Sequence, residues 1–206
     1  MKMALQLLMV EDNPVEREFL SALLARTAVE EILFTPAATL TDALIAARNG
    51  QFDAILLDLS LPDSEGIETF RQVLKTAPDV PIVVLTVSDD QGQALLALQE
   101  GAQDYLFKGQ VDGQTLVRSI RYAVERKRLQ TALTRQSRRL SDHLTVLRGG
   151  FTRLASGDLN VRIGEALEES SEDDDLTGLL ANFDSTVERL RQLSELKAQF
   201  SSMVTH

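Results

Sequence analysis

The 206-residue sequence contains no cysteine and only two histidines, His143 and His206. The lack of cysteine excludes disulfides and thiolate metal sites, and two histidines are too few for an all-histidine zinc site. No apolar run approaches the roughly 18 residues that span a bilayer, and the first ten residues lead into Glu11 without a small-residue cleavage site. We therefore expect a cytoplasmic protein that does not enter a membrane.

Basic residues are also in the minority, with 21 Lys and Arg against 31 Asp and Glu and a net charge of −10. This balance argues against nucleic-acid binding by the chain as a whole, although it leaves room for a local basic patch. The hydrophobic share of 44% and the charged share of 25% are ordinary for a protein that buries a core, and the length suits one or two domains.

One strand, Phe52 to Asp58, is apolar from Ala54 onward and ends on a carboxylate. Continuous apolar residues are typical of a strand that is buried on both faces of a parallel sheet. Ligands of open α/β sheets bind beyond the carboxyl ends of the strands, where Asp58 would lie. Taken alone, Asp58 is explained equally well as a loop-capping residue. The residues at the other strand ends are needed to distinguish a binding site from a loop cap.

The first 125 residues alternate between strand and helix. Helices with apolar residues at helical spacing begin near positions 14, 39, 66, 89 and 112. The segments with strand character are 5–10, 31–35, 52–58, 81–86 and 104–108. Parallel neighbours need helical crossovers, so the pattern predicts one α/β domain with a doubly wound, five-stranded parallel sheet.

Polar residues lie at the carboxyl ends of four of these strands. Glu11 and Asp12 follow the first, Asp58 ends the third, Thr86 ends the fourth and Lys108 ends the fifth. Because parallel strands end at the same edge of a sheet, we expect these side chains to gather there. Crowded carboxylates repel one another unless a cation joins them, and Mg²⁺ prefers such oxygen ligands. The sequence therefore predicts a magnesium site that includes Asp58.

These motifs resemble those of a response-regulator receiver domain over residues 1–125. The resemblance rests on Val10-Glu11-Asp12-Asn13, Leu57-Asp58-Leu59-Ser60-Leu61-Pro62-Asp63-Ser64-Glu65-Gly66, Leu85-Thr86 and Asp104-Tyr105-Leu106-Phe107-Lys108. It implies a flavodoxin-like fold with strand order 2-1-3-4-5. It also implies that Asp58 accepts a phosphoryl group from a phosphohistidine donor protein.

The same resemblance implies a role for each site residue. The expected roles are Mg²⁺ binding by Glu11, Asp12, Asp58 and the backbone carbonyl of Ser60, contact with the phosphoryl oxygens by Thr86 and Lys108, and an inward-turning aromatic switch at Tyr105. Phosphoryl transfer needs mainly positioning and charge neutralisation, which this set supplies. The chain departs from the family at Gly109, where a proline, often with a cis bond, is usual.

The last helix of this region continues beyond residue 125. Residues 118–148 contain neither Gly nor Pro, and four leucines share a heptad frame whose remaining d positions are Gln136 and His143. The leucines are Leu129, Leu133, Leu140 and Leu147. We therefore expect a parallel two-stranded coiled coil over residues 126–144, and hence a homodimer.

The same helix carries nine basic residues against two acids over 118–148. A basic helix can bind nucleic-acid phosphates. However, no recognition motif accompanies it and Tyr122 is its single aromatic residue. A solvated or partner-facing surface is the favoured interpretation.

Residues 145–195 resemble a HAMP signal-relay module, in which two helices are joined by an extended connector. The resemblance rests on Leu154-Ala155-Ser156-Gly157-Asp158-Leu159, Asp175-Leu176 and Ala181-Asn182-Phe183. It implies a parallel dimeric four-helix bundle against which Leu159, Val161 and Ile163 pack. Residues 165–175 hold seven acids and no base, a composition typical of a solvated loop.

Residues 196–206 resemble the start of a histidine kinase phosphoacceptor helix, with Phe200 and Met203 matching its apolar pattern. His206 would then be a second phosphoacceptor, the alternative being the first residue of a purification tag. The chain has no ATP-binding motif, so it is not a complete kinase and its status as an enzyme stays open.

We therefore expect the N-terminal part of a cytoplasmic histidine kinase in a two-component system. Phosphorylation of Asp58 would act through the long helix on a dimeric HAMP-like module. One alternative is an unphosphorylated receiver that serves as a dimerisation scaffold, for which Gly109 leaves room. The other is a response regulator whose basic helix binds DNA.

Overall fold

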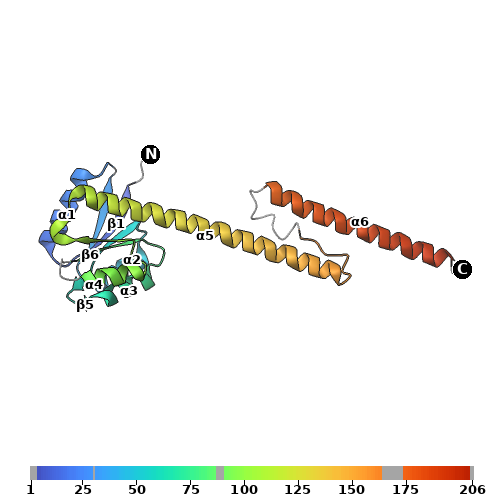
Figure 1. Cartoon of the computed structure of the whole chain (residues 1–206), viewed down its shortest axis with the longest axis horizontal. Coiled ribbons are helices and arrows are strands. Elements are labelled where there is room, and N and C mark those ends of the chain that lie inside the picture. The colour runs from blue at the N-terminus through green and yellow to red at the C-terminus, as the bar shows by residue number, and fades with distance from the viewer. Residues whose placement is uncertain (1–3, 30, 87–90, 164–173, 205–206) are drawn as a thin grey trace. The chain divides into compact units, whose positions relative to one another are not determined.

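The computed structural model describes residues 4–29, 31–86, 91–163 and 174–204 (Figure 1). The chain divides into two compact units, Met1–Thr131 and Ala132–His206. None of the helices in these described ranges combines the length and apolarity needed to cross a bilayer.

The first unit alternates strands and helices, as the sequence predicts. Its elements are β1 (Leu5–Val10), α1 (Pro14–Thr27), β2 (Ile32–Ala37), α2 (Leu40–Asn49), β3 (Ala54–Asp58), β4 (Ser60–Leu61), β5 (Ser64–Glu65), α3 (Ile67–Thr76), β6 (Ile82–Thr86), α4 (Gln91–Gln99), β7 (Asp104–Phe107), the 3₁₀ turn η1 (Lys108–Gln110) and the start of α5 (Gly113–Ala155).

Five of the strands form one parallel sheet in the order β2-β1-β3-β6-β7. Counting only these strands, the order is 2-1-3-4-5, which confirms the flavodoxin-like prediction. All of β3 and β6 is buried, because helices cover both faces of the sheet (Figure 1).

Alternate residues of each central strand enter two separate cores. Leu8, Ile55 and Val84 pack on one face with α2, α3 and α4, where Phe70 is fully buried. Their neighbours in sequence face the opposite core, which is built from α1 and the start of α5. The chief members of that second core are Leu7, Met9, Leu24, Leu56, Val83, Leu116 and Ile120. A one-residue slip in register would therefore exchange the two cores.

The loop after β3 contains an element that the sequence did not predict. Strands β4 and β5 form a two-stranded antiparallel hairpin in which Ser60 pairs with Glu65. Gly66 closes it with φ of +70°, and its N–H donates to the Leu59 carbonyl at 2.8 Å. A left-handed φ favours glycine at this position.

Helix α5 is longer than the predicted coiled coil. Asp112 caps its start by accepting the Thr115 N–H at 2.8 Å, and the helix runs through Gly149 and Gly150 to Ala155. It ends beside Gly157, whose φ is +91°. Of these three glycines, only Gly157 marks a break in the helix.

The second unit has a small apolar core of its own. Val161 and Ile163 of the connector pack with Phe183 and Val187 of α6 (Asp174–Val204). Half-buried Val146, Leu147 and Leu154 of α5 lie against this cluster. Within the unit, α6 runs in the same direction as the C-terminal half of α5 (Figure 1).

Polar contacts fix the connector to α6 as well. The Ile163 N–H donates to Asp184 Oδ1 at 3.0 Å, and Arg162 lies 3.3 Å from Glu188. Of the three connector residues expected to pack, Val161 and Ile163 are buried and Leu159 is half-buried. The acidic run from 165 lies outside the described residues until Asp174.

Both long helices keep exposed apolar residues. On α5 these form a leucine stripe made of Leu129, Leu133, Leu140 and Leu144, each more than half exposed. On α6 they are Leu190, Leu193, Leu196 and Phe200. Leu147, one of the four leucines that share the predicted heptad frame, is instead half-buried against the connector.

Gly150 sets the distance between α5 and the connector. A Cβ there would lie 2.6 Å from Ile163 Cγ2, whereas a Cβ on Gly149 would meet nothing within 4 Å. We expect Gly149→Ala to stabilise the second unit by up to about 1 kcal/mol through helix propensity. The free energy of unfolding of Gly150→Ala should be about 1–3 kcal/mol lower than that of Gly149→Ala, because the added methyl group overpacks the contact with Ile163.

Hydrogen exchange of the amides in 146–163 and 183–187 measures this difference in the full chain. Faster exchange in Gly150→Ala than in Gly149→Ala is expected. Equal protection in the two variants would contradict the packing described.

Candidate functional site

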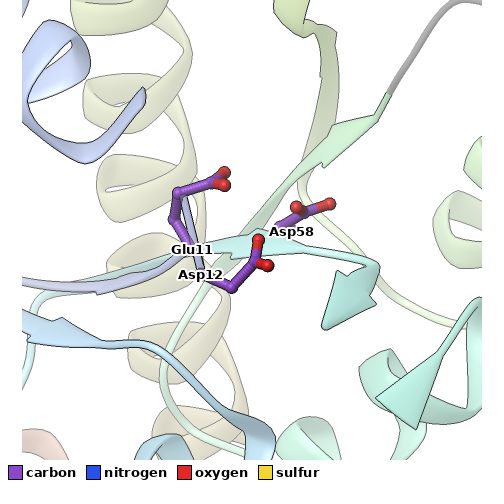
Figure 2. A group of neighbouring side chains, drawn as sticks. All are labelled: Glu11, Asp12 and Asp58. Carbon is purple, nitrogen blue, oxygen red and sulfur yellow. The ribbon is translucent and has the colours of Figure 1, made fainter. Parts of the chain in front are cut away.

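Three carboxylates from two neighbouring strands meet at the carboxyl edge of the sheet. Glu11 and Asp12 follow β1, and Asp58 ends β3, whose Leu57 is in register with Val10. Ligand oxygens of the three lie within 4.8 Å of one another. Figure 2 shows the side chains converging from the two strand ends.

The backbone around these acids holds them in place. Glu11 and Asp58 are buried, and Asp12 is exposed. Asp58 Oδ1 accepts the Ser60 N–H at 3.0 Å, and Glu11 Oε1 accepts the Asn13 N–H at 3.2 Å. The site is therefore built from rigid strand ends and their first turns.

Lys108, in the turn after β7, places its ammonium among these acids. Its Nζ lies 2.7 Å from carboxylate oxygens of Glu11, Asp58 and Glu16. The contact to Asp58 Oδ2 is a hydrogen bond. Glu11 Oε2 and Glu16 Oε2 form ion pairs with the same ammonium, so three carboxylates of the described residues share this cation.

Burial and charge shift the pKa of two of these groups. Burial raises the pKa of Glu11; the Lys108 ammonium opposes this and the charge of Asp58 reinforces it. Burial alone would lower the pKa of Lys108, but hydrogen bonds to Asp58, Glu11 and Glu16 outweigh it and raise that pKa. Lys108 is therefore a permanent cation.

Two further expected residues occupy neighbouring positions. Thr86 is buried at the end of β6, one residue beyond Leu85, the partner of Asp58 in register. Tyr105 in β7 is half-buried and packs edge-on against Phe107 with ring centroids 5.3 Å apart. Ser60 is exposed in β4, directly after the Asp58 strand. His206 and residues 87–90 lie outside the described part of the chain.

The structure adds residues that the sequence reasoning missed. Glu16 contacts Lys108, and Arg17 donates to the backbone carbonyls of Glu11 and Asp12 at 2.5 and 2.8 Å. Asp63 accepts the Leu40 and Thr41 N–H groups, which lower its pKa. In the sequence, the one indication that Glu16 and Arg17 belong to the site is their position in the helix that directly follows Glu11 and Asp12.

The family described as response regulator receiver domain matches residues 7–121, more than half of the chain. The chain belongs to this family. The KDP operon transcriptional regulatory protein KdpE of Escherichia coli is 38% identical over 127 residues, which cover 61% of this chain and 53% of KdpE. Protein PilH of Pseudomonas aeruginosa is 30% identical over 117 residues, covering 56% of this chain and 93% of PilH.

Among solved structures, the receiver domain of the sensor histidine kinase PA1611 of Pseudomonas aeruginosa is similar. It has a TM-score of 0.52 and 30% identity, and the match covers 60% of this chain and 99% of that domain. That structure holds a magnesium ion in its active-site cleft. The chain spans about half the length of curated relatives such as KdpE.

Receiver domains bind Mg²⁺ in the active site, and the residues present here fit that ion. The cluster offers only carboxylate oxygens, the donors that Mg²⁺ prefers. The exposed position of Asp12 leaves one side of the cluster open to the ion and its waters. Mg²⁺ is therefore the cofactor of this receiver.

The raised pKa of Glu11 predicts a pH effect on stability without divalent cations. A carboxyl with a higher pKa in the folded state binds its proton more tightly there, so folding is favoured below about pH 4.5 and stability is lost as the pH rises through the folded pKa. Relative to wild type, Glu11→Gln should therefore gain stability as the pH rises.

Urea unfolding in a chelating buffer at several pH values gives this difference directly. Groups that do not interact with Glu11 titrate equally in both proteins, so they cancel in the comparison. A difference that does not change with pH would contradict the stated effect of burial on Glu11.

Proposed function

We propose that this receiver accepts a phosphoryl group on Asp58 from a phosphohistidine donor protein. The observation that carries the proposal is the convergence of Asp58, two further acids and Lys108 at one edge of the sheet. Family membership supports the same chemistry.

In the transfer, an Asp58 carboxylate oxygen attacks phosphorus and a P–O bond forms. The P–N bond to the donor imidazole breaks, and its electron pair leaves with the ring nitrogen. The ammonium of Lys108, 2.7 Å from Asp58 Oδ2, neutralises charge on the phosphoryl oxygens. Thr86 would donate its hydroxyl to one of them.

Mg²⁺, when bound, supplies the remaining positive charge against the phosphoryl oxygens. Its proposed ligands are Glu11, Asp12, Asp58 and the Ser60 carbonyl. In-line transfer requires little more than this positioning and neutralisation.

Incubation with acetyl phosphate and Mg²⁺ tests the acceptor. We expect wild type to gain the mass of one phosphoryl group in intact-mass spectra, and Asp58→Ala to gain none. Asp79→Asn, which changes an exposed acid of the same unit, should behave as wild type. Equal labelling of wild type and Asp58→Ala would refute the assignment.

The signal is proposed to leave the receiver through α5, because β7 connects the site to that helix. Lys108 directly follows β7, and Asp104 at the other end of the strand accepts the Ser119 hydroxyl at 2.6 Å. Further along α5, Lys127 donates to the Pro78 carbonyl at 2.7 Å. Tyr105, between the two ends of β7, is the proposed switch.

Residues 1–125 are proposed as the receiver, 126–144 as a coiled coil and 145–195 as a HAMP-like module. The connector packing of Val161 and Ile163 between two helices of the same direction supports the module. The leucine stripe and the exposed apolar residues of α6 support a homodimer, since such residues would be buried against a second copy.

The parent protein is proposed to be a cytoplasmic histidine kinase. The likeness to the receiver of a sensor histidine kinase supports this assignment. Residues 196–206 would begin its phosphoacceptor helix, with His206 as the second phosphoacceptor.

Substitution on the leucine stripe tests the dimer. Leu140→Asp should weaken self-association at least about tenfold, because it loses the burial of a leucine and places a charge in the seam. Thr145→Asp adds the same charge at an exposed position on the opposite side of the helix and should leave the dimer intact. Sedimentation equilibrium measures both, and a monomeric wild type would refute the dimer.

DNA binding is the second candidate, and one observation favours it. Nine basic residues lie on 118–148, and KdpE is a transcriptional regulator. Wild type should then be retained on duplex DNA in a salt-dependent way. Loss of this retention in a triple variant, with Arg135, Arg138 and Arg139 all replaced by Ala, would favour this alternative.

A further inference from the structure

Among the described residues, one acidic neighbour of Lys108 is not part of the candidate metal cluster. Glu16 Oε2 lies 2.7 Å from Lys108 Nζ, the same distance as the Glu11 and Asp58 oxygens. The Glu16 side chain is 40% exposed and that of Lys108 only 16%. This carboxylate is outside the group formed by the three clustered acids.

The first turn of α1 places Glu16 there. Asn13 caps the helix by accepting the Val15 N–H at 3.0 Å, and Pro14 is its first residue. Three residues after the cap, Glu16 is directed to the side on which β7 ends, where Lys108 meets it. An acid in the first turn of a helix also interacts favourably with the helix dipole, but that interaction requires no contact with a lysine.

An ammonium has three N–H bonds, and three carboxylates of the described residues lie around that of Lys108. When Asp58 is phosphorylated and Mg²⁺ occupies the cluster, Glu11 and Asp58 serve other partners. Glu16 is outside the metal cluster, so it remains paired with Lys108 and attracts the ammonium away from a phosphoryl oxygen.

We propose that Glu16 is a positioning residue that holds Lys108 in the unphosphorylated pocket and competes with the incoming phosphoryl group for it. The inference rests on the proposed function of Asp58. A phosphoryl group brings about 1.5–2 negative charges, which the Glu16 carboxylate repels across Lys108. The same carboxylate attracts Mg²⁺, so its charge acts on the two ligands in opposite directions.

Titration calorimetry on the full chain, with Mg²⁺ alone and then with beryllofluoride at saturating Mg²⁺, tests the proposal. In Glu16→Gln we expect beryllofluoride, a phosphoryl mimic, to bind about two- to fivefold more tightly, the scale of a partly exposed ion pair. Mg²⁺ alone should bind more weakly by a similar factor. General damage to the fold would weaken both.

Two further variants sharpen the test. Glu18→Gln removes the same charge from an exposed position of α1 and should change neither affinity. Glu16→Asp keeps the charge but withdraws it by one methylene, so its two affinities should lie between those of wild type and Glu16→Gln.

The proposal is overturned if Glu16→Gln matches Glu18→Gln, or if Glu16→Gln weakens beryllofluoride binding. In the second case Glu16 would support Lys108 instead of competing for it. A wild-type protein that fails to bind beryllofluoride with Mg²⁺ would refute the proposed function of Asp58 instead.

Discussion

The attraction between the Lys108 ammonium and the acids around it is the interaction on which the site depends. Glu11 and Asp58 are buried, and removing carboxylates from water is costly unless they are paired. Lys108 offsets this cost by lying 2.7 Å from both. One ammonium cannot balance these acids together with Asp12 and Glu16, however. The pocket therefore keeps a net negative charge, which explains its suitability for a divalent cation.

The sheet and its acidic edge could be predicted because the signals are local and repeated. Residues 54–58 are buried along their whole length, and an uninterrupted apolar run carries that information in the sequence. Once the strands are parallel neighbours, the meeting of Glu11 with Asp58 follows from the register of Val10 and Leu57. The resemblance to receiver domains then supplied the strand order, which the apolar pattern alone does not determine.

Other features could not be predicted because they depend on contacts between distant segments. Glu16 joins the site only because Lys108 reaches α1 from the turn after β7. The β4–β5 hairpin is too short to show a period of two. Helix α5 continues through Gly149 and Gly150 although glycine disfavours helix. The close approach of Ile163 accounts for Gly150, since packing outweighs propensity there.

The position of β7 explains why α5 is the proposed route out of the receiver. This strand lies at the edge of the sheet and pairs only with β6 in the described sheet. An edge strand shifts at a smaller loss of ladder hydrogen bonds than a central one. Lys108 follows one end of β7, and Asp104 joins the other end to Ser119 of α5. Any change in the partners of Lys108 therefore acts on a strand that is hydrogen-bonded to the helix. Because α5 is unbroken as far as Ala155, the segment that contacts β7 and the segment that packs on the connector belong to one continuous element. On the proposed mechanism, a rearrangement at Asp58 needs no additional joint to reach the residues around Gly150.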